Sequence, residues 1–190
     1  MKKILICVTG AVAATVMPSY ILQIRRELNC EVFVMVSENA SKFVTPYALR
    51  IHSGNDVFSD SFQHTKDVNV PHIKLTEEVD VVLVMPATAN IIAKAAHGFC
   101  DDLISTSIVA AQKPIVFVPS MNGKMWFNQA VQENVRKIID FGYYVLEPRN
   151  GIEVEGLKDT FGVMPPLSDI ILVLRQLLYK PILESESTLQ

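Results

Sequence analysis

The sequence predicts an α/β fold, an open parallel sheet with helices on both faces, and three observations lead to this prediction. Short continuous runs of apolar residues recur along the chain, and stretches with the apolar period of a helix lie between them. The runs do not alternate with polar residues, as expected for parallel strands that are covered on both faces. The chain has 190 residues, of which 49% are hydrophobic, and this suits one globular domain.

Strands and helices are expected in alternating order. Four apolar runs carry the strand pattern and a fifth is weaker, at residues 4–8, 32–36, 79–85, 115–118 and, for the weaker run, 143–146. Segments with helical period lie between or after these runs, at residues 18–28, 91–96, 103–111, 126–141 and 168–179. A strand followed by a helix, repeated in this way, is typical of a flavodoxin- or Rossmann-like sheet.

Residues 147–166 interrupt this alternation. They contain Gly151, Gly156 and Gly162 with prolines at both ends, and no run in them predicts a strand or helix of ordinary length. Connections of this length in a compact domain are usually functional or disordered. We therefore expect a flexible substrate flap at 147–166, with a mobile connection as the alternative, and a frayed tail at 182–190. Residues 1–190 then form a single domain.

Composition and charge exclude several classes of function. The formal net charge is −3 and the chain has no Lys/Arg cluster, so we expect no nucleic-acid partner. No apolar run reaches the roughly 18 residues that span a bilayer, and the N-terminal run is too short for a secretory signal, so we expect no membrane association. Cys7, Cys30 and Cys100 form no CxxC pair, which disfavours a disulfide framework and a zinc site and favours a cytoplasmic location.

The turns after the first two expected strands suit a phosphate, because ligands of an open α/β sheet bind at the carboxyl ends of its strands. Gly10, Ala11 and Val12 form a small-residue turn that can bring backbone N–H groups to a phosphate, although a tight turn explains Gly10 equally well. Ser37 and Asn39 either serve the same phosphate or cap the next helix. Neither turn contains Lys or Arg, which favours a single phosphate monoester such as that of FMN.

An asparagine follows the third and the fourth expected strands. Pro86 and Pro119 are expected to end these strands, and Asn90 and Asn122 come a few residues later. A side-chain amide offers both a donor and an acceptor to a flat polar heterocycle or to a carboxylate. Asparagine is also a frequent cap and turn residue, so a purely structural role stays open for each.

These two strand ends resemble motifs of the flavin-containing cysteine decarboxylases. The residues PATANI at 86–91 are similar to the family's PASANT motif, with Thr88 in place of Ser and Ile91 in place of the last Thr. The residues PSMNGKMW at 119–126 match PxMNxxMW at every fixed position, and GFCDDL at 98–103 is similar to G-x-C-D-N-L. The resemblance covers residues 3–146. The family includes phosphopantothenoylcysteine decarboxylase and the lantibiotic peptide decarboxylases of the epidermin and mersacidin type.

The resemblance implies a role for each candidate residue. His72 stands at the position of the family's catalytic histidine and would be the base, whereas the residues alone favour a loop histidine. Asn122 would hold the substrate, and Met125 would pack against the substrate or the flavin. FMN, with FAD as the alternative, would contact Gly10, Ala11, Val12, Ser37, Asn39, Thr88, Ala89, Asn90 and Ser120. Family members build the site where the subunits of a trimer meet, so a homotrimer or a dodecamer of trimers is expected.

One departure from the family pattern narrows the expected function. Phosphopantothenoylcysteine decarboxylases carry a flap cysteine that protonates the enethiolate, and the glycines of this flap align that position with Glu155. An ionised carboxylate is a poor substitute because it repels an enethiolate. We therefore expect oxidative decarboxylation of the C-terminal cysteine of a precursor peptide to an aminoenethiol. The alternatives are a phosphopantothenoylcysteine decarboxylase that uses another acid and a non-catalytic flavin-binding regulatory subunit.

Overall fold

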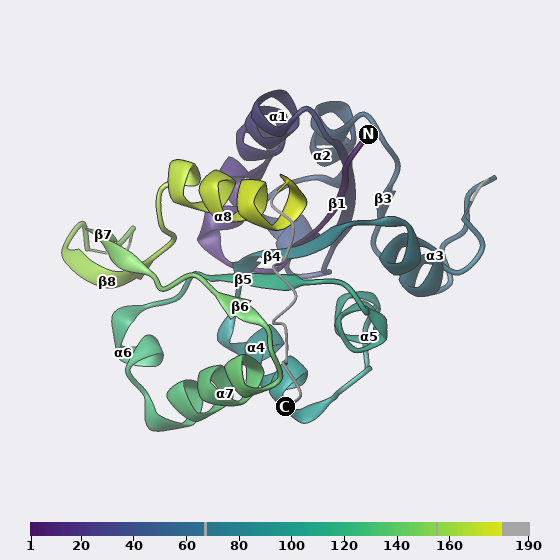
Figure 1. Ribbon diagram of the computed structural model, residues 1–190. Coiled ribbons are helices and arrows are strands. Elements are labelled where there is room, and N and C mark those ends of the chain that lie inside the picture. The colour runs from purple at the N-terminus through teal and green to yellow at the C-terminus, as the bar shows by residue number, and fades with distance from the viewer. Residues whose placement is uncertain (67, 155, 180–190) are drawn as a thin grey trace, which may run out of the picture.

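The core of the protein is a six-stranded parallel sheet, seen in a computed structural model that describes residues 1–66, 68–154 and 156–179. The strand order is β3-β2-β1-β4-β5-β6, and every neighbouring pair is parallel (Figure 1). The strands are β1 (Lys3–Val8), β2 (Glu31–Val36), β3 (Val57–Phe58), β4 (Val81–Ala87), β5 (Ile115–Pro119) and β6 (Tyr144–Val145). This order confirms the predicted flavodoxin- or Rossmann-like fold, and it reverses direction between β1 and β4, where such sheets bind ligands.

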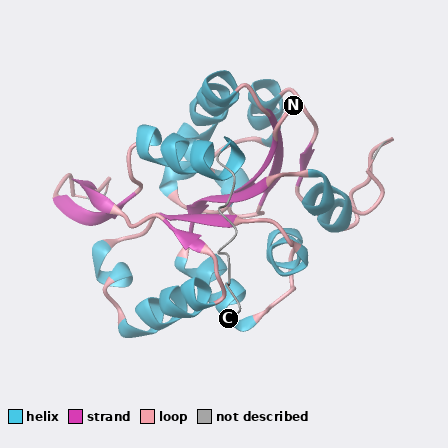
Figure 2. Cartoon of the chain, in the orientation of Figure 1, coloured by secondary structure: helices cyan, strands magenta, loops and turns pink. Residues whose placement is uncertain are grey.

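Helices cover both faces of the sheet (Figure 2). One face carries η1 (Val12–Val16), α1 (Met17–Leu28), η2 (Ala40–Lys42), α2 (Pro46–Ser53) and α8 (Leu167–Tyr179). The other carries α3 (Pro71–Glu78), α4 (Ala89–His97), α5 (Leu103–Ala110), α6 (Gly123–Trp126) and α7 (Gln129–Asp140). Along β1, Ile4 and Ile6 join the first hydrophobic cluster, and Leu5 and Cys7 join the second. Both faces of a strand are therefore buried, which explains the unbroken apolar runs. None of the helices in the described ranges has the length and apolarity needed to cross a membrane.

Several elements differ from the sequence prediction. The single helix expected at 126–141 is two helices, because Asn128 accepts a hydrogen bond from Ala130 N and starts α7 anew, so Trp126 ends α6 instead of starting a long helix. The elements α2, β3 and α3 were not expected; each spans eight residues or fewer and gives a weak periodic signal. Pro86 is the next-to-last residue of β4, and Pro119 is the last residue of β5, so both prolines belong to the strands that they were expected to follow.

Residues 147–166 contain an antiparallel β-hairpin where no regular element was expected. Its strands are β7 (Arg149–Ile152) and β8 (Asp159–Val163), and the hairpin extends from the body of the molecule (Figure 1). Gly156 and Leu157 have positive φ values of 84° and 50° in the turn. Strand β7 is mostly exposed and β8 is mostly half-buried, so the continuous apolar run that marks a fully buried strand is missing from both. The role of this hairpin as a flap stays a prediction; the expected tail at 182–190 and Glu155 lie outside the described residues.

Candidate active site

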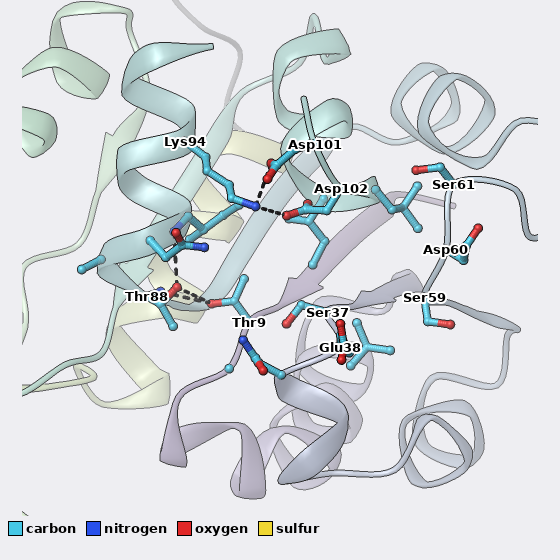
Figure 3. A pocket seen from close by; sticks show the side chains of 18 of the residues that line it. Thr9, Ser37, Glu38, Ser59, Asp60, Ser61, Thr88, Lys94, Asp101 and Asp102 are labelled. Atoms are coloured by element: carbon cyan, nitrogen blue, oxygen red, sulfur yellow. Dashed lines mark hydrogen bonds and ion pairs between the residues drawn. The ribbon is translucent and has the colours of Figure 1, made fainter. Parts of the chain in front are cut away.

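A pocket of about 710 Å³ lies at the carboxyl ends of the central strands (Figure 3). This volume falls within the roughly 300–1,000 Å³ range of small-molecule sites. The pocket is lined by Thr9, Gly10, Val36, Ser37, Glu38, Asn39, Ser59, Asp60, Ser61, Phe62, Thr88, Ala89, Asn90, Ile91, Lys94, Asp101, Asp102, Leu103, Ile104 and Met125. It therefore occupies the position where the strand order reverses, between β1 and β4.

Thr9 joins the ends of β1 and β4 at one side of this pocket. Its buried hydroxyl donates to the carbonyl of Pro86 at 2.6 Å and accepts from the backbone N–H of Thr88 at 3.1 Å. The hydroxyl of Thr88 accepts from Ile91 N at 3.3 Å and so caps the start of α4. Helix α4 thus begins at the pocket, and its N-terminal N–H groups provide a positive partial charge there.

The turns after β1 and β2 lie against one another. A Cβ atom on Gly10 would lie 2.6 Å from the Cβ of Asn39, so a side chain at residue 10 would push the two turns apart. The Ser37 hydroxyl accepts from Ala40 N at 3.2 Å, and the Asn39 amide oxygen accepts from Lys42 Nζ at 2.9 Å. The Ser37 hydroxyl therefore contacts the first residue of η2, and because it acts there as an acceptor, its own proton remains able to reach a ligand.

The charges in the pocket are dominated by carboxylates. Lys94 Nζ lies 2.7 Å from Asp101 Oδ1 and 2.5 Å from Asp102 Oδ2 (Figure 3). Burial lowers the pKa of Lys94, but its contacts with the two carboxylates outweigh burial and hold that pKa above its usual value. The hydrogen bond from Lys94 holds the pKa of Asp101 below its usual value. The lysine is thus fully compensated, and the donors left for a ligand are neutral hydroxyls, amides and backbone N–H groups.

Asn122 lies under the hairpin instead of in this pocket. Its Oδ1 accepts from Lys124 N at 2.8 Å, which caps α6, and its Nδ2 donates to the carboxylate of Glu153 in the hairpin. The hairpin is seated on the same loop, since Met121 N donates to Gly162 O at 3.1 Å. The amide predicted to hold a substrate carboxylate is therefore bound to a carboxylate of the chain itself.

His72 is the second residue of α3, not a loop residue, and it does not line the pocket. Its Nδ1 is buried and has no hydrogen-bond partner among the described residues. Buried polar atoms usually have a partner, so this nitrogen departs from the common pattern. The His72 role as a base stays a prediction.

The structure brings together some predicted site residues and separates others. Those that line the pocket are Gly10, Ser37, Asn39, Thr88, Ala89, Asn90 and Met125, and those that do not are Ala11, Val12, His72, Ser120 and Asn122. Sequence reasoning missed Lys94, the residues 59–62 and Glu153. Residues 59–62 follow β3, and ligands of an open α/β sheet bind at the carboxyl ends of its strands. A strand at Val57–Phe58 would therefore have predicted them, but two residues give no recognisable strand pattern. Nothing in the sequence pattern pointed to Glu153.

The fold and the pocket agree with a comparison of known families. A family model described as Flavoprotein matches residues 1–179. The chain belongs to this flavoprotein family. The neutral donors of the pocket, beside a helix start, fit a flavin with a single phosphate better than they fit a polyphosphate.

Curated relatives point to enzymes of coenzyme A biosynthesis. The chain is 33% identical over 153 residues to the coenzyme A biosynthesis bifunctional protein CoaBC of Bacillus subtilis (strain 168), covering 79% of the chain and 37% of that protein. It is also 33% identical over 153 residues to the probable phosphopantothenoylcysteine decarboxylase of Streptococcus mutans, covering 80% of the chain and 85% of the relative. The chain thus spans well under half the length of the bifunctional relatives.

Solved structures of cysteine decarboxylases share the fold. The FMN-dependent cysteine decarboxylase SpaF has a TM-score of 0.79 at 30% identity, covering 93% of this chain and 97% of SpaF. A Cys-to-Ser variant of PPC decarboxylase complexed with pantothenoylaminoethenethiol gives 0.81 at 26%, covering 92% and 96%. A His-to-Asn variant of EpiD with the substrate peptide DSYTC gives 0.78 at 27%, covering 90% and 98%. Within the flavoproteins, the chain therefore belongs with the cysteine decarboxylases and their phosphopantothenoylcysteine decarboxylase relatives, as the resemblance predicted.

Proposed function

We propose that this protein uses FMN to decarboxylate a substrate that ends in a cysteine with a free carboxylate, with phosphopantothenoylcysteine as the first candidate. The observation that carries this proposal is the contact between Asn122 Nδ2 and a carboxylate, on a loop that matches the PxMNxxMW motif. The only described side chain that hydrogen-bonds to this carboxylate is the neutral amide. A substrate carboxylate bound in the same way is held without the strong charge stabilisation that would oppose its loss.

FMN fits the pocket between β1, β2 and β4, and structural neighbours named as FMN-dependent support this choice. When bound, FMN would supply a two-electron oxidation that makes a carbon–sulfur double bond in the substrate, the electron sink for loss of CO2; the two electrons would return to the product where CO2 alone is lost, and pass to oxygen where two hydrogens are lost as well. The hydroxyl of Ser37 and the start of α4 at Thr88 line this pocket and are its proposed contacts with the cofactor. The compensated pair of Lys94 with two aspartates shapes the wall beside it.

His72 is the proposed base for the substrate thiol. A neutral imidazole can accept a proton from a thiol as a general base. Because His72 and Asn122 both lie outside the pocket of a single chain, we propose that subunit contact completes the site, as in a trimer or a dodecamer of trimers. Exposed apolar side chains near the pocket support such a contact; Phe62 is 90% exposed and Met125 48%. Light scattering of the purified protein tests this assembly.

The substrate is the finer part of the proposal. From the residues and the resemblance alone, a precursor peptide is the expected substrate, but the curated relatives support the alternative better. The Streptococcus mutans relative named as a phosphopantothenoylcysteine decarboxylase is matched over 85% of its own length. We therefore rank phosphopantothenoylcysteine first.

A peptide with a C-terminal cysteine is the second candidate, and one sequence observation favours it. Residues 147–166 contain no cysteine, whereas the resemblance places a proton-donating cysteine in this segment of phosphopantothenoylcysteine decarboxylases. The PPC decarboxylase neighbour that was solved with an enethiol is itself a variant that lacks a cysteine. The peptide-bound EpiD structure is a neighbour of comparable similarity.

Mass spectrometry of two parallel reactions in air tests the proposal. The flavin-loaded protein is incubated with phosphopantothenoylcysteine in one reaction and with the peptide DSYTC in the other. Loss of CO2 alone from phosphopantothenoylcysteine supports the first candidate, and loss of CO2 together with two hydrogens from the peptide supports the second. If neither compound loses CO2, the proposed function is wrong.

A further inference from the structure

We propose that Glu153 is an internal ligand of the substrate-carboxylate site, so that a substrate must displace Glu153 from Asn122 before its own carboxylate can bind. This inference rests on the proposed function, in which Asn122 receives that carboxylate. It assigns to the hairpin a role in admitting substrates, through one named side chain.

The orientation of the Asn122 amide is fixed by its own helix. Its Oδ1 accepts from Lys124 N at 2.8 Å as the cap of α6, so the oxygen is already used. An amide has its two donors on the nitrogen, and these must therefore face the other way, toward the hairpin. There Nδ2 donates to Glu153 Oε1. A substrate carboxylate that approaches the donors of this amide therefore meets the chain's own carboxylate, which already accepts from one of them.

The base of the hairpin is held firmly against the loop that carries Asn122. Besides the bond from Met121 N to Gly162 O, the Phe161 ring lies 5.3 Å from that of Phe127 and 6.5 Å from that of Trp126, between ring centroids. A Cβ on Gly123 would lie 2.6 Å from Phe161 O, so backbone meets backbone at this contact. The position of β8 relative to Asn122 is therefore fixed without any help from Glu153.

Glu153 lies beyond this base, near the tip. Its backbone N–H donates to Lys158 O at 2.9 Å, just outside the strand pairs of β7 and β8. Within the part of the chain that the structure describes, no ion pair involves Glu153, and Asn122 is its side-chain hydrogen-bond partner. A carboxylate held by one neutral amide at a partly exposed site is readily exchanged for another carboxylate that brings further contacts.

Displacement has a consequence for which substrates enter. A ligand with a free carboxylate can replace Glu153 at the amide, and repulsion between the two carboxylates then favours movement of the hairpin tip away from Asn122. A ligand whose carboxyl group is blocked as an amide gains nothing from removing Glu153. The contact therefore lowers the affinity for a ligand with a free carboxylate and leaves the affinity for a blocked ligand unchanged.

Calorimetric titration tests this competition without any reaction. The probes are the peptide DSYTS, in which serine replaces the reactive cysteine, and phosphopantothenoylserine, each as the free acid and as the carboxamide. We expect Glu153→Ala to bind the free acid of the fitting probe several-fold more tightly than the wild type does, and to bind the carboxamide with unchanged affinity. Glu153→Gln should lie between the two. Asp159→Asn is the matched control, because it removes an exposed carboxylate from the same hairpin without touching Asn122, and its affinities should equal those of the wild type.

Equal free-acid affinities for the wild type and Glu153→Ala would overturn the inference. Failure of both free acids to bind even Glu153→Ala would overturn it as well, because Asn122 would then be no carboxylate site. Steady-state kinetics are a second test. Glu153→Ala should lower KM several-fold and leave kcat nearly unchanged. A large fall in kcat would overturn the inference, because Glu153 would then take part in the reaction itself. If no cysteine substrate loses CO2 but the titrations still depend on Glu153, the proposed function fails and this inference stands.

Discussion

The pocket between β1 and β4 and the hairpin of β7 and β8 are built in different ways. The pocket is made of short turns at the ends of buried strands, and hydrogen bonds such as those of Thr9 tie these turns together. The hairpin lies mostly in solvent, is fixed at its base by Gly162 and Phe161, and touches Asn122 near its tip through one side chain. Rigid support suits a cofactor that stays bound, whereas a partly supported hairpin suits a substrate that comes and goes.

The largest effect is expected from replacement of His72, which lies outside both the pocket and the hairpin and should separate flavin binding from catalysis. Replacement of His72 by Asn should leave flavin binding intact, because His72 does not line the pocket, and should abolish loss of CO2, because the proposed base is gone. The flavin absorbance of the purified variant and CO2 release with both substrate candidates check this. Retained activity would remove His72 from the mechanism.

The next largest effect should follow from Gly162→Ala. Gly162 has a φ of 123°, and a Cβ there would lie 2.0 Å from Met121 O, so the base of the hairpin must shift away from the loop that carries Asn122. A misplacement of about 1 Å can cost roughly 100-fold in rate, and we expect a loss of that order in kcat/KM. Flavin content should stay at the wild-type level. Gly142→Ala is the control, since its φ is also positive but nothing lies within 4 Å of the added Cβ; equal rates in the two variants would contradict the idea.

Thr9→Val should act in the opposite region. The methyl group that replaces the hydroxyl leaves Pro86 O and Thr88 N without their buried partner, at a cost of about 1–3 kcal/mol in the free energy of unfolding. Urea denaturation measures this loss, and the fraction of protein with bound flavin should fall with it. The hairpin contacts should be unaffected, so the rate per bound flavin should change little. A variant with normal flavin content would show that the Thr9 bonds do not organise the pocket.

Lys94→Gln should have a smaller effect on stability, about 1 kcal/mol near neutral pH. The raised pKa of Lys94 means that its contribution is complete below its unfolded value of 10.5 and is lost as pH rises through the folded value. The lowered pKa of Asp101 means that its contribution is present above 3.8 and is lost as pH falls through the folded value. The difference in thermal stability between wild type and Lys94→Gln should therefore be constant around neutral pH and shrink at both extremes. A difference that persists at both extremes would mean that the ion pairs are not its source.

The smallest effect is expected at the cysteines, which lie outside both regions. Burial raises the pKa of Cys30 to about 11 and that of Cys7 further still, and Cys100 is exposed. Iodoacetamide at neutral pH should therefore label Cys100 in the native protein and leave the two buried thiols unmodified, which peptide mass mapping measures. Cys100→Ala should change the free energy of unfolding by no more than about 0.5 kcal/mol. Labelling of Cys7 would indicate local opening of the sheet.

The sequence predicted the pocket better than the hairpin, for physical reasons. The run at 4–8 is apolar throughout because both faces of β1 are covered, and the residues that follow such a strand, among them Gly10, are placed by the sheet itself. No local pattern in the sequence predicts the role of Glu153. Its contact with Asn122 joins residues 31 positions apart and depends on a hairpin whose first strand is mostly exposed. Helix α3 was missed for a similar reason, since eight residues with few apolar positions give little periodicity. Local pattern therefore predicts the elements of this fold, and contacts between distant loops need the structure.

The complete burial of β1 bears on how this protein can change over evolution. Every side chain from Ile4 to Val8 is fully buried, so neither face of the strand below the pocket can accept a larger or polar residue without disturbing one of the two cores. The exposed apolar side chains of the described part of the hairpin, Ile152, Val154 and Leu157, carry no such restriction. Mutations that persist should therefore accumulate in the hairpin, and a lineage could acquire a new substrate while the strand beneath its cofactor stays the same.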